Sequence, residues 1–260
     1  MKDDTSFDWG TRSLHDGEEL EVALGPLQLR IRRISGEIRL AYRREGDGAE
    51  AVDLRGPAGA DRWIRWVANP EWSGEFDLAP SLPTRPLVVR PDNEFRLMQD
   101  SEARIYVRVP LEVRVQALGH TLLQVPTHVL SDTWWGSTEA GDLHYFLDTQ
   151  ARRHVDDEEF EEHLAVCPVQ LRNRSAEDLM VSRISLQTEF LTIYRDGTRL
   201  WSDATTVRYR GAEEESDLRV AGEPPDEAPQ GQLVSVARQP LGRGFSARTF
   251  ARQIRSSLGW

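Results

Sequence analysis

Residues 104–118, RIYVRVPLEVRVQAL, decide the fold class because their apolar side chains recur at every second position. Side chains of a β-strand alternate between the two faces of a sheet, so this spacing predicts a strand with one buried and one wet face. The run is longer than a typical strand, and Pro110 has no N–H to donate, so we expect a bend or a switch between sheets there. The predicted buried face consists of Ile105, Val107, Val109, Leu111, Val113, Val115 and Ala117.

The same alternation recurs along the rest of the chain, and the turns between segments have the spacing of β-sandwiches and barrels. Residues 190–201, FLTIYRDGTRLW, predict a hairpin with Asp196-Gly197 as its turn. The acidic run HVDDEEFEEH, 154–163, predicts a solvated linker. We therefore expect an all-β fold of two antiparallel β-sandwich-like domains. The N-terminal domain, sandwich-like or barrel-like, would span 1–155, and a smaller C-terminal sandwich with a terminal helix would span 156–260.

The one predicted helix lies in FSARTFARQIRSSLGW, residues 245–260, with Ser246 as its N-cap. Apolar residues four positions apart and arginines off that stripe make it a basic amphipathic helix. We favour packing of its apolar face on the protein's own sheet, and docking on a partner or an anionic membrane surface is the alternative. The candidate docking residues are Arg248, Phe250, Arg252, Ile254 and Arg255.

The composition excludes several classes of partner. The formal net charge is −11, which argues against a nucleic-acid-binding protein. No apolar run is long enough to span a membrane, and the N-terminal residues lack the apolar core of a signal peptide. Cys167 is the single cysteine, so no disulfide forms within the chain, and its apolar neighbours predict that it is buried. We expect a cytoplasmic protein without stable membrane insertion, and the oligomeric state stays open.

The sequence lacks the common catalytic and cofactor signatures, including GxGxxG, GxxxxGK[ST], HExxH, CxxC and GxSxG. His154 and His163 flank an acidic run, but this run lacks the spaced oxygens and turn glycine of a hard-cation loop. We therefore predict no catalytic residues, no metal site and no cofactor. An enzyme with acid and base groups from separated strands, such as Asp132, Glu139 and His144, is a weaker alternative.

The adjacent tryptophans of LSDTWWGSTEAGDLHYF, residues 130–146, raise the clearest functional question. In a strand, Trp134 and Trp135 point to opposite faces, so only one can join a given core. We favour burial of both, one in the sandwich and one against an edge or the second domain, because aromatic residues are most often core. The alternative is an exposed aromatic that stacks on a ligand or anchors a partner. The candidate binding residues are Asp132, Thr133, Trp134, Trp135, His144 and Arg152.

These observations favour a non-enzymatic interaction protein with an unknown protein partner. A small-molecule or carbohydrate-binding sandwich that uses a tryptophan platform is the main alternative. A pocket with convergent polar groups beside Trp134 or Trp135 would favour the second hypothesis.

Several segments carry a resemblance to a known family. In the first half these are PSLPTRP (80–86), IYVRVPLEV (105–113), LSDTWWG (130–136) and GDLHYFLDT (141–149). In the second half they are CPVQLRNRSAEDLMVSRISL (167–186) and LTIY (191–194). Together they resemble the uncharacterised prokaryotic domain of unknown function family 432. That family has no established activity, so the resemblance implies no catalytic residues. It associates the chain with mechanosensitive channel systems and implies a bacterial protein with an accessory or regulatory role.

Overall fold

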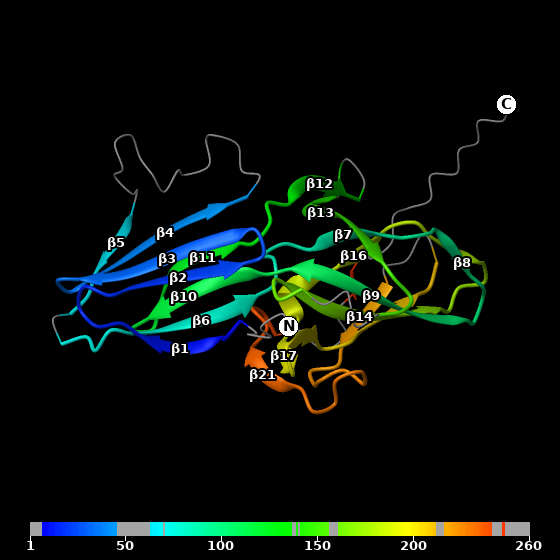
Figure 1. Ribbon diagram of the computed structural model, residues 1–260. Helices are drawn as coiled ribbons and strands as arrows, with labels where there is room; N and C mark the ends of the chain where they lie inside the picture. The colour runs from blue at the N-terminus through cyan, green and yellow to red at the C-terminus, as the bar shows by residue number, and fades with distance from the viewer. Residues whose placement is uncertain are drawn as a thin grey trace. The chain divides into compact units, whose positions relative to one another are not determined.

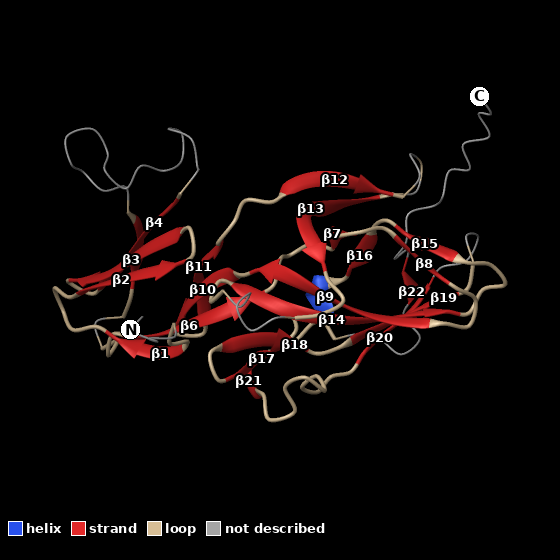
Figure 2. Ribbon diagram, turned by 45° about the vertical axis from the view of Figure 1, so that its right-hand side comes forward, coloured by secondary structure: helices blue, strands red, loops and turns tan. Residues whose placement is uncertain are grey.

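The computed structural model is almost entirely β in the part of the chain that it describes, which confirms the predicted all-β class. The helix found there is a single 3-10 turn, η2 (Thr188–Phe190), shown in blue in Figure 2. The described residues are 7–45, 63–69, 71–136, 139, 141–155, 161–211, 216–240 and 246–247.

The chain divides into two compact units, and each unit is assembled from separate pieces of sequence. The chain passes between the two units several times. Unit 1 comprises Met1–Ser81, Pro110–Val129 and Glu161–Leu164, and unit 2 comprises Leu82–Val109, Leu130–Phe160 and Ala165–Trp260.

Unit 1 contains two antiparallel four-stranded sheets (Figure 1). The first has the order β2 (Glu19–Leu24), β3 (Leu27–Ile34), β4 (Glu37–Arg44) and β5 (Ile64–Val67). The second has the order β1 (Gly10–Ser13), β6 (Glu75–Ser81), β10 (Glu112–Ala117) and β11 (His120–Pro126).

Both sheets of unit 1 contribute to one hydrophobic cluster. Leu29 and Leu40 of the first sheet and Phe76 and Val113 of the second belong to it, and all four are at most 1% exposed. Burial of each such side chain stabilises the fold by about 1.5–3 kcal/mol. The period-2 pattern thus places one apolar face of each sheet in a shared core.

Unit 2 contains mixed sheets, which differs from the antiparallel sheets expected from the sequence. One sheet has the order β12 (Ser131–Trp135), β13 (Asp142–Ala151), β7 (Leu87–Pro91) and β16 (Ile184–Leu186), with β13 and β7 parallel. In the largest sheet, β14 (Leu164–Asn173) pairs in parallel with β18 (Arg199–Ser202) and β19 (Thr205–Tyr209). The remaining strands are β8 (Phe95–Leu97), β9 (Glu102–Pro110), β15 (Leu179–Val181), β17 (Ile193–Asp196), β20 (Ser216–Val220), β21 (Gln232–Ser235) and β22 (Ser246–Ala247).

The alternating stretch around Pro110 forms two strands, β9 and β10, separated at Leu111. β9 pairs with β14, whereas β10 pairs with β6 and β11, so the predicted switch between sheets is confirmed. The Leu111 N–H donates to the carbonyl of His163 and its carbonyl accepts from Thr127 N, so its backbone bonds leave the ladder. The predicted Asp196-Gly197 turn is also confirmed, because β17 and β18 are antiparallel and Gly197 has a φ of 59°.

The predicted helical N-cap is wrong. Ser246 and Ala247 form β22, in which Ser246 lies opposite Asp217 of β20. Backbone pairing to a neighbouring strand has replaced the helix start that the local serine and spacing favoured. The proposed docking residues Arg248, Phe250, Arg252, Ile254 and Arg255 lie outside the described residues.

Candidate functional site

The structure divides the tryptophan pair between the two faces of β12. Trp134 is 52% exposed, whereas Trp135 is 6% exposed, so the interpretation that both are core is wrong. The cause is the strand alternation itself, because β12 lies at the edge of its sheet and only one face is covered. One indole of the pair is therefore half exposed.

The side chains around Trp134 form a mixed apolar and charged surface. In the β12–β13 register, Trp134 lies opposite Leu143 and Asp132 lies opposite Tyr145, so all four side chains share one face. Leu143 is 43% exposed, and Tyr145 is half-buried. We call these four residues, together with Arg85, the β12–β13 surface.

Arg85 organises this surface, although no motif in the sequence singles it out. Its guanidinium carbon lies 5.3 Å from the centre of the Tyr145 ring, and its Nη1 donates to Asp132 Oδ1 at 3.0 Å. The parallel pairing of β7 with β13 brings Arg85 there, because Tyr145 N donates to the carbonyl of Pro86 at 2.9 Å. No sequence spacing encodes this pairing, since residues 85 and 145 are far apart in the chain.

Three of the predicted candidates, Thr133, Trp135 and His144, lie on the opposite, covered face of the hairpin. His144 is 3% exposed, lies opposite Thr133, and contacts the Trp135 ring edge-on at 5.9 Å between ring centres. Its Nε2 lies 3.4 Å from the Ser185 hydroxyl, and its buried Nδ1 has no hydrogen-bond partner in the described part of the chain. Burial lowers the pKa of His144, so the ring is held neutral inside the sheet.

The weaker enzyme hypothesis drew on Asp132, His144 and Glu139. Asp132 and His144 lie on opposite faces of the hairpin, so they do not form an acid–base pair, and Asp132 is occupied by Arg85. Glu139 is exposed. Arg152 pairs with Asp92, at 3.1 Å between Nε and Oδ2, and its backbone bridges Tyr106.

Asp203 and Cys167 are buried titratable groups with structural surroundings. Burial raises the pKa of Asp203 to about 6, although its carboxylate accepts the Thr192 N–H at 3.0 Å. Burial likewise raises the pKa of Cys167 to about 12, so the thiol is not an activated nucleophile. Cys167 is fully buried, which confirms the sequence prediction.

Asn173, within the family-like segment 167–186, is fully buried and was missed by the sequence analysis. Its Nδ2 donates to the carbonyls of Leu97, Met98 and Glu177 at 2.8–3.2 Å. Its Oδ1 accepts from the backbone and hydroxyl of Ser175 at 3.0 and 2.8 Å. A buried amide with this many hydrogen bonds fixes the turn after β14. The role of Asn173 in the family-like segment is therefore structural.

The histidines of the acidic run have different environments. His154 is exposed, whereas His163 is 8% exposed and stacks on His128 with 5.1 Å between ring centres. Burial lowers the pKa of both stacked rings, and Glu161 opposes that shift. Among the residues that the structure places, no group of three or more His, Cys, Asp or Glu side chains could hold a metal ion.

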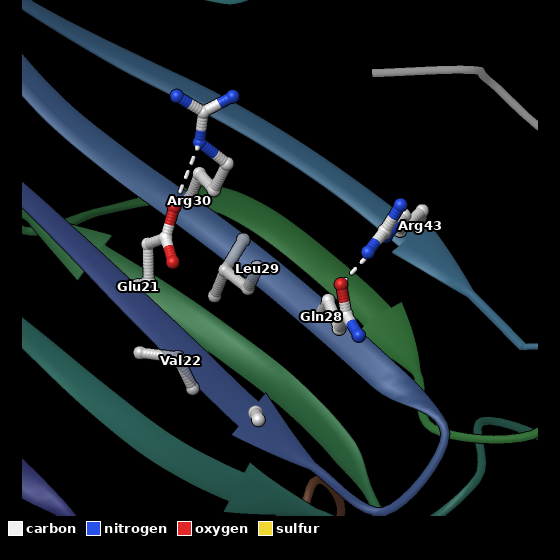
Figure 3. Close-up of a pocket in the computed structure, with 7 residues that line it drawn as sticks. Glu21, Val22, Gln28, Leu29, Arg30 and Arg43 are labelled. Atoms are coloured by element: carbon white, nitrogen blue, oxygen red, sulfur yellow. Dashed lines mark hydrogen bonds and ion pairs between the residues drawn. The ribbon is translucent and has the colours of Figure 1, made fainter. Parts of the chain in front are cut away.

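A hollow lies on unit 1, over the face of β2, β3 and β4 that points away from the core (Figure 3). Its volume is about 380 Å³, within the usual range of small-molecule sites. Arg43 Nε donates to Gln28 Oε1 at 2.6 Å, and Arg30 Nε lies 3.5 Å from Glu21 Oε1. The Trp63 ring lies 5.1 Å from the Arg30 guanidinium. The hollow thus combines charged groups with a nearby aromatic.

Comparison with known proteins gives a family but no relative of known activity. A model of the family described as "Protein of unknown function (DUF432)" matches residues 8–254. No curated protein and no solved structure matches the chain. None of the helices in the described ranges is long and apolar enough to cross a membrane. The match spans nearly the whole length, as the motifs quoted from both halves indicated, and the chain belongs to the DUF432 family.

Proposed function

We propose that this protein is a non-enzymatic interaction module that binds a partner protein through the β12–β13 surface. The observation that carries the proposal is the exposed Trp134, set beside Tyr145 and Arg85 on one face. Tryptophan, tyrosine and arginine are the residue types most enriched among the side chains that dominate binding energy at protein interfaces.

The energetic argument rests on the area that Trp134 leaves in water. A tryptophan side chain buries up to about 250 Å², so covering the exposed half removes about 100 Å² and yields about 2–3 kcal/mol. The Arg85–Asp132 pair, with side chains 43% and 55% exposed, would lie at the rim of such a contact. A rim pair of this kind favours orientation and specificity more than affinity.

The setting of this interaction is part of the same proposal. The sequence indicates a cytoplasmic protein, and the family resemblance associates it with mechanosensitive channel systems. The cytoplasmic part of such a channel is therefore the first partner to test. We also infer that unit 1 is a β-sandwich, because both of its sheets contribute side chains to one core.

The test compares partner recovery by tagged wild-type protein and by Trp134→Ala. The proposal expects Trp134→Ala to lower recovery of the partner at least about tenfold, the loss typical of a dominant interface residue. Leu233→Ala is the matched control, because Leu233 is also an exposed apolar residue of unit 2, at 59%. Circular dichroism verifies that each variant is folded. Equal recovery with wild type and Trp134→Ala, or no partner at all, would contradict the proposal.

Small-molecule binding in the hollow of Figure 3 is a second candidate. It is favoured by Arg43, an exposed arginine whose terminal guanidinium nitrogens have no partner among the placed residues. A planar guanidinium of this kind suits a carboxylated ligand. Nuclear magnetic resonance titration with glucose and glucuronate tests this candidate. Selective shifts with glucuronate that disappear in Arg43→Gln would support it.

A further inference from the structure

The side of unit 1 where β5 and β11 lie has an open apolar cavity that the β12–β13 surface does not include. β5 and β11 are the edge strands of the two sheets of this unit. Between them is a cavity of about 270 Å³, lined mainly by apolar side chains. Its walls include Ile38, Trp66, Trp72, Leu118 and Leu122. Ile38 and Trp72 also belong to the core of unit 1, so the cavity opens onto that core between the two edge strands.

β5 is exposed along its whole length and carries large apolar residues. Ile64 is 40%, Trp66 41% and Val67 83% exposed. In the β4–β5 register, Trp66 lies opposite the buried Ile38, so Trp66 is on the core-facing side of its sheet. Its side chain is nevertheless partly in water. In the described part of the chain, no further strand pairs with the other edge of β5.

The hairpin on the opposite wall has two irregular features, and both belong to leucines of the cavity. The turn between Ala117 and His120 has φ values of 52° at Leu118 and 77° at Gly119, which is the pattern of a type I′ turn. Asn-Gly suits that turn far better than Leu-Gly, because a leucine in the left-handed region is strained. Leu118 is also 57% exposed, so burial in the fold does not offset this strain.

The second irregularity is a β-bulge. Val115 pairs with Leu123 and Gln116 pairs with Thr121, which leaves Leu122 as the extra residue. Bulges redirect side chains and are frequent beside functional sites. The strained turn and the bulge thus place two leucines at one cavity. Other residues would close the same hairpin with less strain, so the strain points to a role for these leucines outside the fold itself.

We propose that an extended segment of a protein partner adds to the edge of β5, where the described residues place no further strand, and inserts an apolar side chain into this cavity. Strand addition accounts for an exposed strand edge beside an apolar cavity. Main-chain hydrogen bonds between β5 and the added strand supply affinity, and the cavity supplies specificity for one side chain. The cavity, at about 270 Å³, accommodates one large aliphatic or aromatic side chain of the partner together with parts of the adjacent partner residues. The chain carries a net charge of −11, which opposes pairing with a second copy and favours a partner segment with lysine or arginine around the apolar anchor.

The test selects peptides from a phage-displayed random dodecapeptide library on the immobilised full chain. The proposal expects enriched peptides without central proline, with alternating apolar residues and basic flanks. Binding of a synthetic enriched peptide is then measured by fluorescence polarisation. Leu118→Asn and Val67→Lys each weaken it at least tenfold, and hydrogen exchange of the amides of residues 64–67 slows on binding.

Two control results separate this site from the alternatives. Leu118→Asn keeps the turn and removes only the leucine, and a melting temperature at or above that of wild type shows that lost binding is not lost folding. Trp134→Ala keeps peptide affinity within twofold, because the β12–β13 surface is a separate site. The proposal is overturned by an absence of enriched peptides or by binding that is insensitive to Leu118→Asn. It is equally overturned by binding without protection of β5, or by a concentration-dependent dimer that Val67→Lys abolishes.

Discussion

Arg104 of β9 and Glu227 form a two-pronged ion pair, with both Nε–Oε1 and Nη2–Oε2 at 2.7 Å. Tyr106, two residues along the same face, donates its hydroxyl to Glu227 Oε1 at 2.6 Å. Burial raises the pKa of Glu227, but the bonds from Arg104 and Tyr106 outweigh burial and hold that pKa below its ordinary value. The proline-containing segment 221–230, which follows β20, is thus anchored to β9.

Arg104→Gln, Glu227→Gln and the double variant test this anchor. The two side chains are 25% and 22% exposed, so we expect each single variant to lower the free energy of unfolding by about 1–3 kcal/mol. The double variant should cost less than the sum, because the second change removes a charge already left unpaired. Urea unfolding measures all three. Purely additive losses would show that the pair does not couple the segment to the strand.

Asp203 makes a pH-dependent contribution to stability. Burial raises its folded-state pKa from 3.8 to about 6, so ionisation is unfavourable in the folded protein. Its contribution is therefore fully present below about pH 4 and is lost as the pH rises through 6. The shift of about two pKa units corresponds to about 3 kcal/mol.

The check is urea unfolding of wild type and Asp203→Asn between pH 4 and pH 7. The variant should lack this part of the pH dependence, so its stability relative to wild type should increase with pH. The two proteins are compared by the slope of unfolding free energy against pH. The variant also loses one acceptor oxygen, but that loss shifts the stability by the same amount at every pH and leaves the slope unchanged. Parallel pH profiles of the two proteins would contradict the assignment.

The stacked His128 and His163 rings give the opposite dependence. Their folded-state pKa values lie below 6.5, chiefly because of burial, so the unfolded chain binds protons more readily. Stability should fall as the pH drops below about 6.5. His128→Gln should flatten the dependence of unfolding free energy on pH between 5 and 7, whereas the exposed His120→Gln should leave it unchanged. An unaltered slope in His128→Gln would rule out this role.

Gly25 tests the close packing of His163. A methyl group on Gly25, which has a φ of 55°, would overlap Cγ of the His163 ring. Gly197, with a φ of 59° and nothing within 4 Å of such a methyl group, is a matched control. We expect Gly197→Ala to cost about 1 kcal/mol from backbone strain alone, and Gly25→Ala to cost about 1–3 kcal/mol more from overpacking. Thermal unfolding measures the difference, and equal losses would show that the His163 ring moves aside freely.

Leu118→Asn should stabilise the protein in the absence of any partner. Asparagine occupies the left-handed region with less strain than leucine, so we expect a gain of about 0.5–1 kcal/mol in the free energy of unfolding. Gly119, the other central residue, already suits the turn and stays unchanged. Urea unfolding checks the gain. A loss of stability would show that the Leu118 side chain supports the fold.

Local sequence pattern determined much of the fold. Alternation along 104–118 predicted the strands, and Pro110 predicted the switch between sheets, because strand period and proline chemistry act over a few residues. The same alternation required Trp134 and Trp135 to point in opposite directions. It did not reveal which of the two would be covered, since coverage depends on the position of β12 in its sheet.

Only the tertiary structure decided the features that join distant parts of the chain. The parallel pairing of β7 with β13 places Arg85 beside Tyr145, and the pairing of β22 with β20 overrode the helix start predicted at Ser246. The position of β5 at the end of its sheet, among the described strands, likewise follows from strand order. By itself, the sequence determined the all-β class, the alternating faces and the location of several turns. Strand order, parallel pairing and the exposed edges came from non-local contacts, because backbone hydrogen bonds between strands carry no signal in local residue spacing.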